Sequence, residues 1–425
     1  TAAKRAQIEG YNEDMAGRAL RVLGVAYRDV ERLPKNADEI ETRLVFCGLL
    51  GMIDPPRPQA KAAVRECQQA GILPVMITGD HIVTARAIAK ELGILRSKDR
   101  SLTGAQLDAM SQKELSRHIF EYTVFARVSP EHKVRIVKAF QSRGAVVAMT
   151  GDGINDAPAL KAADIGCAMG VSGTDVAKGA ADMILTDDNF STIVAAVRQG
   201  RGIFENIKKT VHFLLSCNIG EIITVLAAFL MRLPTPLLAI QLLWVNLVTD
   251  CFPALALGME DAEGDIMKRK PRNAKDGVFA GNMGLDCVVQ GLIITVLVLA
   301  SFFVGVYFDM GYIHIADMVA GNADEEGVMM AFITLNMVEI FHCFNMRSRR
   351  ASLFAMKKQN KWLWASAALA LVLTVIVTVQ PTLAEMFFGP VTLELKGVLA
   401  ALGLAFLIIP LMEIYKAIMR AVEKE

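Results

Sequence analysis

The sequence has no marked excess of charge of either sign and no pair of cysteines at metal-binding spacing. Its 425 residues carry 45 Lys and Arg against 44 Asp and Glu, so no global field favours binding to nucleic acid. None of the seven cysteines forms a CxxC pair, which argues against a zinc or soft-metal site and predicts free thiols in a reducing compartment. An initiator methionine and a signal peptide are also absent, and the opening TAAKRAQIEG favours a truncated or processed chain.

Hydrophobic residues, in contrast, are abundant and unevenly distributed. They make up 53% of the chain, and the mean hydropathy of +0.38 is high for a soluble protein. The apolar excess begins after residue 210, in stretches of about 20 residues that are long enough to cross a membrane. The first 200 residues instead alternate short apolar runs with polar helical segments. This division predicts a cytosolic module followed by a membrane module.

Short apolar runs in the first module are candidate strands of a sheet. They are Leu44–Met52, Ile72–Thr78, Thr123–Ala126, Ala145–Met149, Ile165–Met169 and Asp182–Thr186. Polar helical segments separate most of them, an order that predicts a parallel sheet buried by helices on both faces. In such a sheet the active site lies at the carboxyl ends of the strands.

Polar signatures follow these runs, and the most informative is TGDGINDAPALK at 150–161. It places Asp152, Asp156 and Asn155 at a strand-to-helix turn, where a hydrated divalent cation and a phosphoryl group could be held. Thr78 could donate its hydroxyl to a phosphoryl oxygen and Lys133 could neutralise the transferring group, although a solvated lysine at a helix end is the simpler interpretation of Lys133 alone. The signatures are DPPRP at 54–58, TGD at 78–80, ARVSPEHK at 126–133 and GDGIND at 151–156.

The membrane module is predicted to contain six spans. They run over Phe213–Met231, Leu237–Leu257, Leu285–Phe308, Val328–Met346, Trp362–Val379 and Val398–Ile418. Basic residues gather at 267–275, at 347–361 and after Lys416, whereas 309–326 carries acids and neither Lys nor Arg. By the positive-inside rule the basic loops, the soluble module and the C-terminus are cytoplasmic.

Several polar residues within the spans are candidate cation ligands, because ionisable groups in hydrocarbon are costly unless they face an interior pathway. They are Asn218 and Glu221 in the first span, Asn246, Thr249 and Asp250 in the second, and Glu339 in the fourth. The spacing within each of the first two sets places its members on one helix face. Pro253 has no N–H for the carbonyl of Thr249, which frees that oxygen. Hard oxygen ligands favour calcium over a soft metal, while interhelical hydrogen bonding is the alternative for Asn and Thr.

The stretches MITGDH, ARVSPEHK and AMTGDGINDAPALK, continued by DDNFSTIVAAVRQGRGIFENIKK, resemble the P-type ATPases over nearly the whole chain. The resemblance implies a phosphorylation domain of the haloacid dehalogenase-like (Rossmann-like) fold that uses ATP and Mg²⁺. It assigns Asp152 to magnesium, Asp156 and Asn155 to the hinge loop, Thr78, Gly79, Asp80 and Lys133 to the phosphate, and Arg21 and Arg127 to the nucleotide.

The stretches NIGE and LLWVNLVTD are similar to the type II calcium pumps, in which the residues that match the six candidate ligands coordinate calcium. Sodium-potassium pumps carry an aspartate where this chain has Asn246, which weighs against them. The match around Glu339, VEIFHCFN, is weaker, so one of the two calcium sites that the resemblance implies is less secure than the other. Two ions per cycle and exchange for protons follow as hypotheses.

One departure from the family outweighs the matches: its nucleophile is the aspartate of a DKTG motif, and no DKTG occurs here. In the family this motif lies on the central strand of the same sheet and comes earlier in the polypeptide, with the actuator domain and four membrane helices. We therefore expect the C-terminal portion of a pump, inactive by itself, whose sheet lacks its nucleophile strand. Its predicted parts are the end of the nucleotide-binding domain (1–43), the phosphorylation domain (44–203) and an all-α bundle of six transmembrane helices (204–425).

The predicted function is that of part of an ATP-driven calcium pump in the plasma membrane, with the lipid bilayer and the missing N-terminal half as partners. A pump for sodium, potassium or protons is an alternative. Another is a membrane-anchored remnant or regulatory subunit that hydrolyses nothing, and a third is a phosphatase fused to an anchor. The missing nucleophile supports the remnant, whereas the retained Asp152, Asp156 and membrane ligands argue against it.

Overall fold

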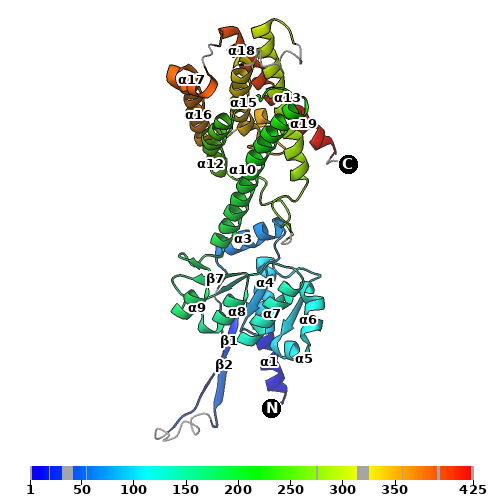
Figure 1. Ribbon diagram of the computed structural model, residues 1–425. Helices are drawn as coiled ribbons and strands as arrows, with labels where there is room; N and C mark the ends of the chain where they lie inside the picture. The colour runs from blue at the N-terminus through cyan, green and yellow to red at the C-terminus, as the bar shows by residue number, and fades with distance from the viewer. Residues whose placement is uncertain are drawn as a thin grey trace. The chain divides into compact units, whose positions relative to one another are not determined.

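A computed structural model describes residues 2–18, 20–30, 42–53, 55–273, 276–313, 325–356, 358–389 and 393–422. The chain divides into two compact units (Figure 1). One, here called the α/β unit, comprises Thr1–Arg198 and Gly264–Lys275, and the other, the helical unit, comprises Gln199–Glu263 and Asp276–Glu425. The three-part division of the sequence at residues 43 and 203 stays a prediction.

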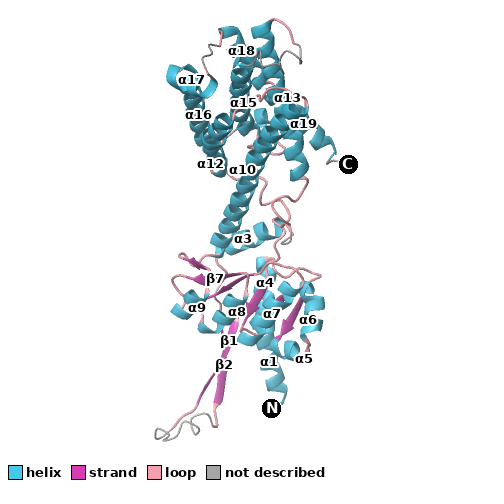
Figure 2. Cartoon of the chain, in the orientation of Figure 1, coloured by secondary structure: helices cyan, strands magenta, loops and turns pink. Residues whose placement is uncertain are grey.

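Six strands of the α/β unit form two parallel sheets of three strands each (Figure 2). The first sheet has the order β3 (Met76–Thr78), β5 (Tyr122–Ala126) and β4 (Arg100–Thr103), and the second the order β6 (Ala148–Gly151), β7 (Ile165–Met169) and β8 (Met183–Leu185). Every pairing within them is parallel. The predicted parallel α/β architecture is therefore confirmed.

Helices cover both faces of the first sheet, as the alternation of side chains along β5 requires. Val124 and Ala126 pack against α3 (Pro58–Gln69) and α4 (Ile82–Leu92), while Phe125 packs on the opposite face. The helices of that opposite face are α5 (Gly104–Ala109), α6 (Gln112–His118), η1 (Ile119–Glu121) and α7 (Pro130–Ser142). All five residues of β5 are buried, so it is a central strand.

Each of the two sheets has two edge strands, β3 and β4 in the first and β6 and β8 in the second, and the edges of β3 and β6 are the ones that concern the interior between the sheets. Within the described residues β3 pairs only with β5, and β6 pairs only with β7. Ile77 of β3 nevertheless packs against the cluster that contains Met149 of β6, so both edges border the same apolar interior. This is the arrangement expected of a sheet whose central strand is not in this chain.

One predicted strand lies elsewhere. The run Leu44–Met52 forms β2 (Val45–Met52), but β2 pairs antiparallel with β1 (Arg21–Tyr27) and is not part of the parallel sheets. Its expected burial is wrong: Phe46 and Leu50, like Leu23 and Tyr27 of β1, are exposed. Helix α1 (Ala2–Gly17) precedes this hairpin. Asp54 of the DPPRP signature lies outside the described residues, and Pro58 begins α3.

The second sheet is followed by the helix that enters the helical unit. Short helices η2 (Ile154–Asp156), α8 (Ala157–Ala162) and α9 (Asp175–Ala180) connect its strands. Helix α10 then runs without a break over Phe190–Leu230, so the first predicted span, Phe213–Met231, continues a helix that begins well before it.

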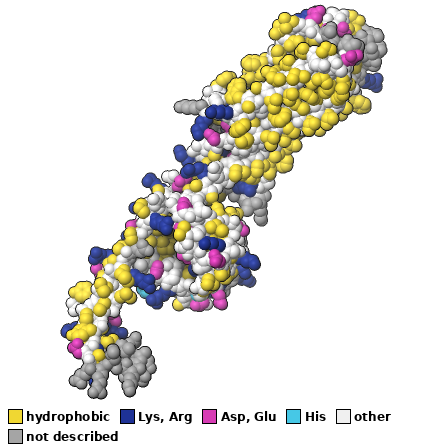
Figure 3. Space-filling view, turned by 90° about the vertical axis from the view of Figure 1, so that its left-hand side faces the viewer, with side chains coloured by type: hydrophobic (Ala, Val, Ile, Leu, Met, Phe, Trp, Pro, Cys, Tyr) yellow, Lys and Arg dark blue, Asp and Glu magenta, His cyan; other side chains and the backbone are white. Residues whose placement is uncertain are grey.

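Six helices of the helical unit are long and apolar enough to cross a membrane, as predicted. They cover Phe190–Leu230, Ala239–Gly258, Met283–Met310, Glu326–Asn345, Lys361–Val379 and Leu395–Val422. Hydrophobic side chains cover much of the surface of this unit in Figure 3. The chain is therefore a multi-pass membrane protein.

The elements of these spans are α10, then α11 (Ala239–Trp244), η3 (Val245–Thr249) and α12 (Cys251–Gly258), α13 (Met283–Met310), α15 (Glu325–Asn345), α16 (Lys361–Val379), and α18 (Leu395–Phe406) with α19 (Ile408–Val422). Short helices η4 (Leu353–Ala355) and α17 (Pro381–Phe388) lie between spans. Helix α15 is the most enclosed of the six spans, because 89% of its most apolar stretch is buried inside the protein. It packs against α13, α16, α18 and α19. A polar side chain on α15 therefore faces protein and not lipid.

Candidate functional site

Two carboxylates meet in the interior of the helical unit. Asp250 follows η3 and Glu339 lies on α15, and both side chains are fully buried. One oxygen of each carboxylate and the thiol of Cys217 on α10 all lie within 4.8 Å of one another. None of the four carboxylate oxygens accepts a hydrogen bond from an amide or hydroxyl of the described residues. Buried charge of this kind is costly unless a cation or protons balance it.

A break in helical geometry positions Asp250. Between α11 and α12 the chain forms a turn of π-helix over Val245–Thr249, and the Asp250 N–H donates to the Val245 carbonyl five residues back, at 3.0 Å. Such a turn widens the helix and is frequent at functional sites. Pro253, buried in α12, has no N–H to donate to the carbonyl of Thr249 four residues back, so that helical hydrogen bond is missing. The π-turn was not predicted, although Pro253 signalled an irregular helix.

Hydrogen bonds orient the predicted amide ligands of the first two spans. Asn246 Nδ2 donates to both oxygens of Glu221, at 3.0 and 2.8 Å, and to the Leu242 carbonyl at 2.9 Å. Asn218 Nδ2 donates to the Leu214 carbonyl at 2.7 Å. Both amide nitrogens are thereby used, which leaves the amide oxygens as the atoms offered to a cation. Glu221, the last of the predicted ligands, lies on α10 and is 6% exposed.

Sequence reasoning missed two members of this group, Cys217 and Asn336. Asn336 on α15 accepts a hydrogen bond from Thr249 Oγ1 at 2.6 Å, and it stands one helical turn before Glu339. Cys217 lies one helical turn before Glu221 on α10, and this i, i+4 spacing could have shown from the sequence that the two side chains share a helix face. Carboxylate, amide and hydroxyl oxygens form a donor set for a hard cation, to which a thiol adds little. All seven cysteines are free, as predicted.

A second group of predicted residues lies at the carboxyl end of β6. The Lys133 ammonium contacts Asp156 Oδ1, and Asp156 Oδ2 accepts the N–H groups of Asp152 at 3.2 Å and Gly153 at 3.1 Å. Burial raises the pKa of Asp156, but the bonds from Lys133 and the two backbone N–H groups outweigh it, and the net pKa is below its ordinary value. Asp156 is therefore a charged, fixed anchor for Lys133.

The start of α7 fixes Lys133. Ser129 and His132 form a reciprocal cap, in which Ser129 Oγ accepts the His132 N–H at 3.4 Å and His132 Nδ1 accepts the Ser129 N–H at 3.1 Å. Pro130 occupies the first helical position, where its missing N–H costs nothing. The SPEHK sequence thus begins a helix at a defined residue and sets the place from which Lys133 reaches Asp156.

The loops after β3 and β5 hold a third group. Thr78 Oγ1 donates to Asp80 Oδ2 at 3.0 Å, and the Asp80 N–H donates back to Thr78 Oγ1 at 3.1 Å. The Arg127 N–H donates to the Asp80 carbonyl at 3.1 Å, with Arg127 at a φ of 50°. Gly79 stands between Thr78 and Asp80 and is exposed. The structure therefore brings Thr78, Asp80 and Arg127 together at the strand ends.

The remaining predicted residues are exposed. Asp152 and Asn155 lie at the end of β6, where the Asp152 carbonyl accepts the Thr174 N–H at 2.8 Å. One exposed carboxylate beside the buried Asp156 can hold a hydrated Mg²⁺, which binds proteins through one or two carboxylates and keeps several waters. Arg21 begins β1, opposite Met52 in the exposed hairpin, and takes no part in the hydrogen bonds of these groups.

Comparison with protein families matches both units. Residues 234–418 match the family described as cation transporting ATPase, C-terminus. Residues 4–164, and again 133–197, match the haloacid dehalogenase-like hydrolases.

Curated relatives match most of the chain. A calcium-transporting ATPase 1 of Bacillus cereus is 47% identical over 91% of this chain and 44% of its own length, and a calcium-transporting ATPase of Bacillus subtilis is 45% identical over 90% of the chain and 42% of its own length. The human calcium-transporting ATPase type 2C member 1 is 39% identical over 90% of the chain and 40% of its own length. The chain thus spans less than half the length of these relatives.

Proposed function

This chain belongs to the P-type cation-transporting ATPases, in which it matches the C-terminal portion of a calcium pump, and we propose that the complete protein uses ATP to transport Ca²⁺ across a membrane. The observation that carries the proposal is the pair of fully buried carboxylates, Asp250 and Glu339, whose oxygens accept no hydrogen bond from the residues that the structure describes. A divalent cation supplies the missing positive charge, and oxygen donors from three helices suit Ca²⁺.

The proposed calcium ligands are Asn218, Glu221, Asn246, Thr249, Asp250 and Glu339. Three carboxylates exceed the charge of one Ca²⁺, which is compatible with two ions in one cavity or with protons that replace them after release. Asn246 holds Glu221 through both carboxylate oxygens and so orients it toward the same interior. Entry of Ca²⁺ would rearrange these contacts, since the Glu221 oxygens would exchange the Asn246 amide for the cation.

The proposed phosphoryl-transfer site lies at the strand ends of the α/β unit. In this proposal Lys133, fixed by Asp156, neutralises the phosphoryl oxygens, and Thr78 turns its hydroxyl from Asp80 to the same group. Asp152 would hold Mg²⁺ with Asn155 beside it, and the bound ion would neutralise charge on the phosphate. Arg127 and Arg21 are proposed to contact the nucleotide.

The phosphorylated aspartate would come from a strand that this chain does not contain. The open edges of β3 and β6 border one apolar interior, and we place the DKTG strand of a preceding half between them. The exposed apolar face of the β1–β2 hairpin would likewise be covered by the rest of a nucleotide-binding domain. An actuator domain and four further membrane helices would make up the rest of the proposed preceding half.

Helix α10 is proposed to couple the two sites, because one uninterrupted helix begins at Phe190 after β8 and carries Cys217, Asn218 and Glu221 in the membrane. A tilt of its first turns on phosphorylation would move these side chains. The basic segments 267–275 and 347–361 favour a cytoplasmic α/β unit, and we propose the plasma membrane as the location.

Calcium-dependent phosphorylation from labelled ATP tests this function. This chain would be expressed alone and together with an N-terminal half that contains DKTG, and assembly of the two would be verified by co-purification. We expect label only in the assembled pair, only with Ca²⁺, and none with Asp250→Asn. Labelling of the pair that persists in Asp250→Asn but fails in Asp152→Asn would instead indicate a pump with another cation site. A verified assembly that takes no label would favour a regulatory or remnant protein.

A further inference from the structure

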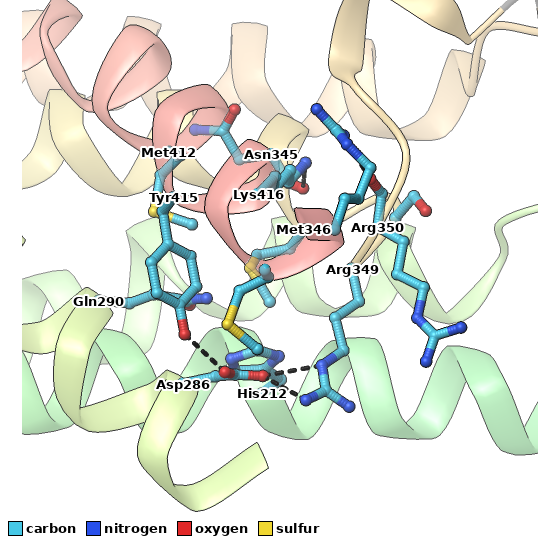
Figure 4. Close-up of a pocket in the computed structure, with 13 residues that line it drawn as sticks. His212, Asp286, Gln290, Asn345, Met346, Arg349, Arg350, Met412, Tyr415 and Lys416 are labelled. Atoms are coloured by element: carbon cyan, nitrogen blue, oxygen red, sulfur yellow. Dashed lines mark hydrogen bonds and ion pairs between the residues drawn. The ribbon is translucent and has the colours of Figure 1, made fainter. Parts of the chain in front are cut away.

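A small polar pocket lies at one end of the helical unit, outside the predicted cation site (Figure 4). It is formed by α10, the beginning of α13, the segment after α15, and α19. The side chains on which the argument rests are His212, Asp286, Gln290, Asn345, Lys416 and Arg420, with Arg349 and Arg350 at the rim. Arg349 and Arg350 belong to the predicted basic segment after the fourth span, and Lys416 and Arg420 belong to the last helix.

The charge of the pocket is strongly positive. Four basic side chains line it, those of Arg349, Arg350, Lys416 and Arg420, against the single carboxylate of Asp286. That carboxylate is already satisfied, by Arg349 Nε at 2.7 Å and by the Tyr415 hydroxyl at 2.6 Å. Among the described residues that line the pocket, basic side chains thus outnumber carboxylates, a balance that favours an anion.

Two of these cations are bonded to neutral groups in the described structure. Lys416 Nζ donates to the carbonyls of Asn345 at 2.7 Å and Ala351 at 3.3 Å, although its side chain is only 3% exposed. Arg420 Nη1 donates to the Arg350 carbonyl at 2.6 Å. These bonds orient the two charges but do not neutralise them, so an anion at this place would gain more than one at an ordinary surface arginine.

Buried polar atoms without partners lie in the same wall. Asn345 is fully buried and neither atom of its amide has a hydrogen-bond partner in the described structure; the same is true of Gln290 Oε1 and His212 Nε2, both on side chains that are 3% exposed. The Asn345 amide and the His212 ring nitrogen can donate to an acceptor oxygen, and Gln290 can accept from a bound water. A ligand or ordered water is the usual explanation for such atoms.

Two of the helices that line the pocket also carry exposed apolar side chains. On α13, Leu285, Val288 and Leu292 are exposed in one stripe, and on α19 Leu411, Ile414 and Ile418 are exposed in another. Both stripes lie in candidate membrane spans, and the same spans contribute Asp286 and Tyr415 to the pocket lining. A ligand that combines an anionic group with acyl chains can therefore occupy the pocket and the stripes together.

We propose that this pocket binds the phosphate of an anionic phospholipid, with the lipid's acyl chains along the apolar stripes of α13 and α19. The enclosed space is about 10 Å³, room for one water-sized atom group, so a single phosphate oxygen enters while the rest of the headgroup stays at the rim between Arg350 and Arg420. Free phosphate shares this chemistry, but the apolar stripes favour the lipid because they add hydrophobic burial that free phosphate lacks.

The binding of phosphatidylglycerol and of phosphatidylcholine to the purified full-length protein tests the proposal, with native mass spectrometry or thermal shift in detergent as the measurement. The wild type should bind phosphatidylglycerol preferentially. Arg350→Gln with Arg420→Gln should weaken that binding about tenfold or more. Lys358→Gln with Lys361→Gln is the matched control, because it removes two exposed charges at the same end outside the pocket and should preserve the preference.

A second variant tests the pocket wall without shortening an arginine. Asn345→Asp is nearly isosteric and adds a negative charge to the residues that line the pocket, so it should also reduce phosphatidylglycerol binding about tenfold. An equal affinity for both lipids in the wild type, or an unchanged preference in both pocket variants, would overturn the proposal. Displacement of the lipid by millimolar inorganic phosphate, with equal stabilisation by that phosphate, would assign the pocket to free phosphate and would equally reject a lipid site.

Discussion

Gly151 is the residue whose size most directly affects the proposed phosphoryl-transfer site. A Cβ at this position would lie 2.7 Å from the Asp156 carboxyl carbon and 2.9 Å from its Oδ2, closer than such contacts occur in proteins. Gly151→Ala should therefore displace Asp156 and with it Lys133. We expect phosphorylation of the full-length protein to fall about tenfold or more, since displacements near 1 Å have effects of that order. Labelling from ATP measures this change.

Gly153 supplies the control for that substitution. It stands in the same loop at a φ of −103°, and its nearest contact for an added Cβ is Asp156 Oδ2 at 3.6 Å, an ordinary van der Waals separation. Gly153→Ala should retain most of the phosphorylation. Equal losses in the two variants would show that loop flexibility, and not the position of Asp156, determines the rate.

Asp188 should make the loop before α9 sensitive to acid. Hydrogen bonds from the Val171 N–H at 2.9 Å and the Ser172 N–H at 2.8 Å lower the pKa of Asp188 to about 2 from 3.8. The contribution of this carboxylate to stability is complete above pH 4 and disappears as pH falls through about 2, because protonation removes the acceptor charge. Pepsin cleavage at 170–173 should rise over that interval.

Asp188→Asn isolates this carboxylate. Asp188 has a φ of 48°, which Asn also tolerates, so the substitution removes the charge without backbone strain. The variant should be cleaved quickly at pH 4 already and should change little toward pH 2, with cleavage of the 93–99 loop as the reference for protease activity. Parallel pH profiles in the two proteins would contradict the assignment.

At the residue scale, the positions of candidate site residues could be predicted from their spacing in the sequence, whereas contacts between residues far apart in the sequence could not. The positions of Asp152 and Asp156 after β6, and of Asn246 and Asp250 in one span, follow from sequence periodicity. The bond from Thr249 to Asn336 joins residues 87 apart, and no local pattern marks Asn336 as its partner. The roles of the candidate ligands remain predictions until they are measured.

At the scale of elements, one buried ion pair connects three parts of the helical unit. The Arg347 guanidinium, 1% exposed, donates to Glu260 after α12 at 2.8 Å and to the Lys358 carbonyl before α16 at 2.6 Å. Asn360 Nδ2 donates to the same Glu260 at 2.8 Å. The network fixes the end of the second span against the connection between the fourth and fifth.

Arg347→Gln should destabilise the protein strongly, because it leaves the Glu260 charge buried with less compensation. Removal of one partner of a buried pair costs roughly 3–5 kcal/mol, and thermal unfolding in detergent would show it. Lys358→Gln is the control: its pair with Asp261 at 3.3 Å is exposed on both sides, and such pairs contribute about 0–1 kcal/mol. A similar small effect in both variants would mean that water reaches Glu260.

Elements with a strong hydrophobic pattern were predicted well, and those defined by irregular geometry were not. Strand β7 has the predicted bounds, and six spans were found in order. Strand β4 was missed because Arg100–Thr103 is short and carries one apolar residue. Strand β2 was assigned to the wrong environment because an apolar run indicates burial somewhere but not against which partner. The break between α18 and α19 fits Pro410, which removes a helical N–H.

At the scale of the whole molecule, the open edges of β3 and β6 predict where a preceding half joins this chain. Strands β5 and β7 are paired on both sides, whereas β3 and β6 each have one unpaired side within the described residues. Backbone amides of a strand that is unpaired on one side exchange hydrogen with solvent through small local openings. Amides of a strand that is paired on both sides exchange only when a larger part of the sheet opens. In this chain alone, peptides that cover 76–78 and 148–151 should therefore exchange hydrogen faster than those that cover 122–126 and 165–169.

Hydrogen–deuterium exchange on the longer protein then distinguishes a completed sheet from two independent ones. If a strand inserts between β3 and β6, the exchange of amides in both should slow by about a hundredfold or more, since each gains a paired neighbour on its open side, while β5 and β7 serve as internal references that change little. Protection of β3 alone would place the joining segment on one sheet and leave the second open. Fast exchange of both strands in the longer protein would refute the inserted strand, and with it the proposed position of the phosphorylated aspartate between Thr78 and the Lys133–Asp156 pair.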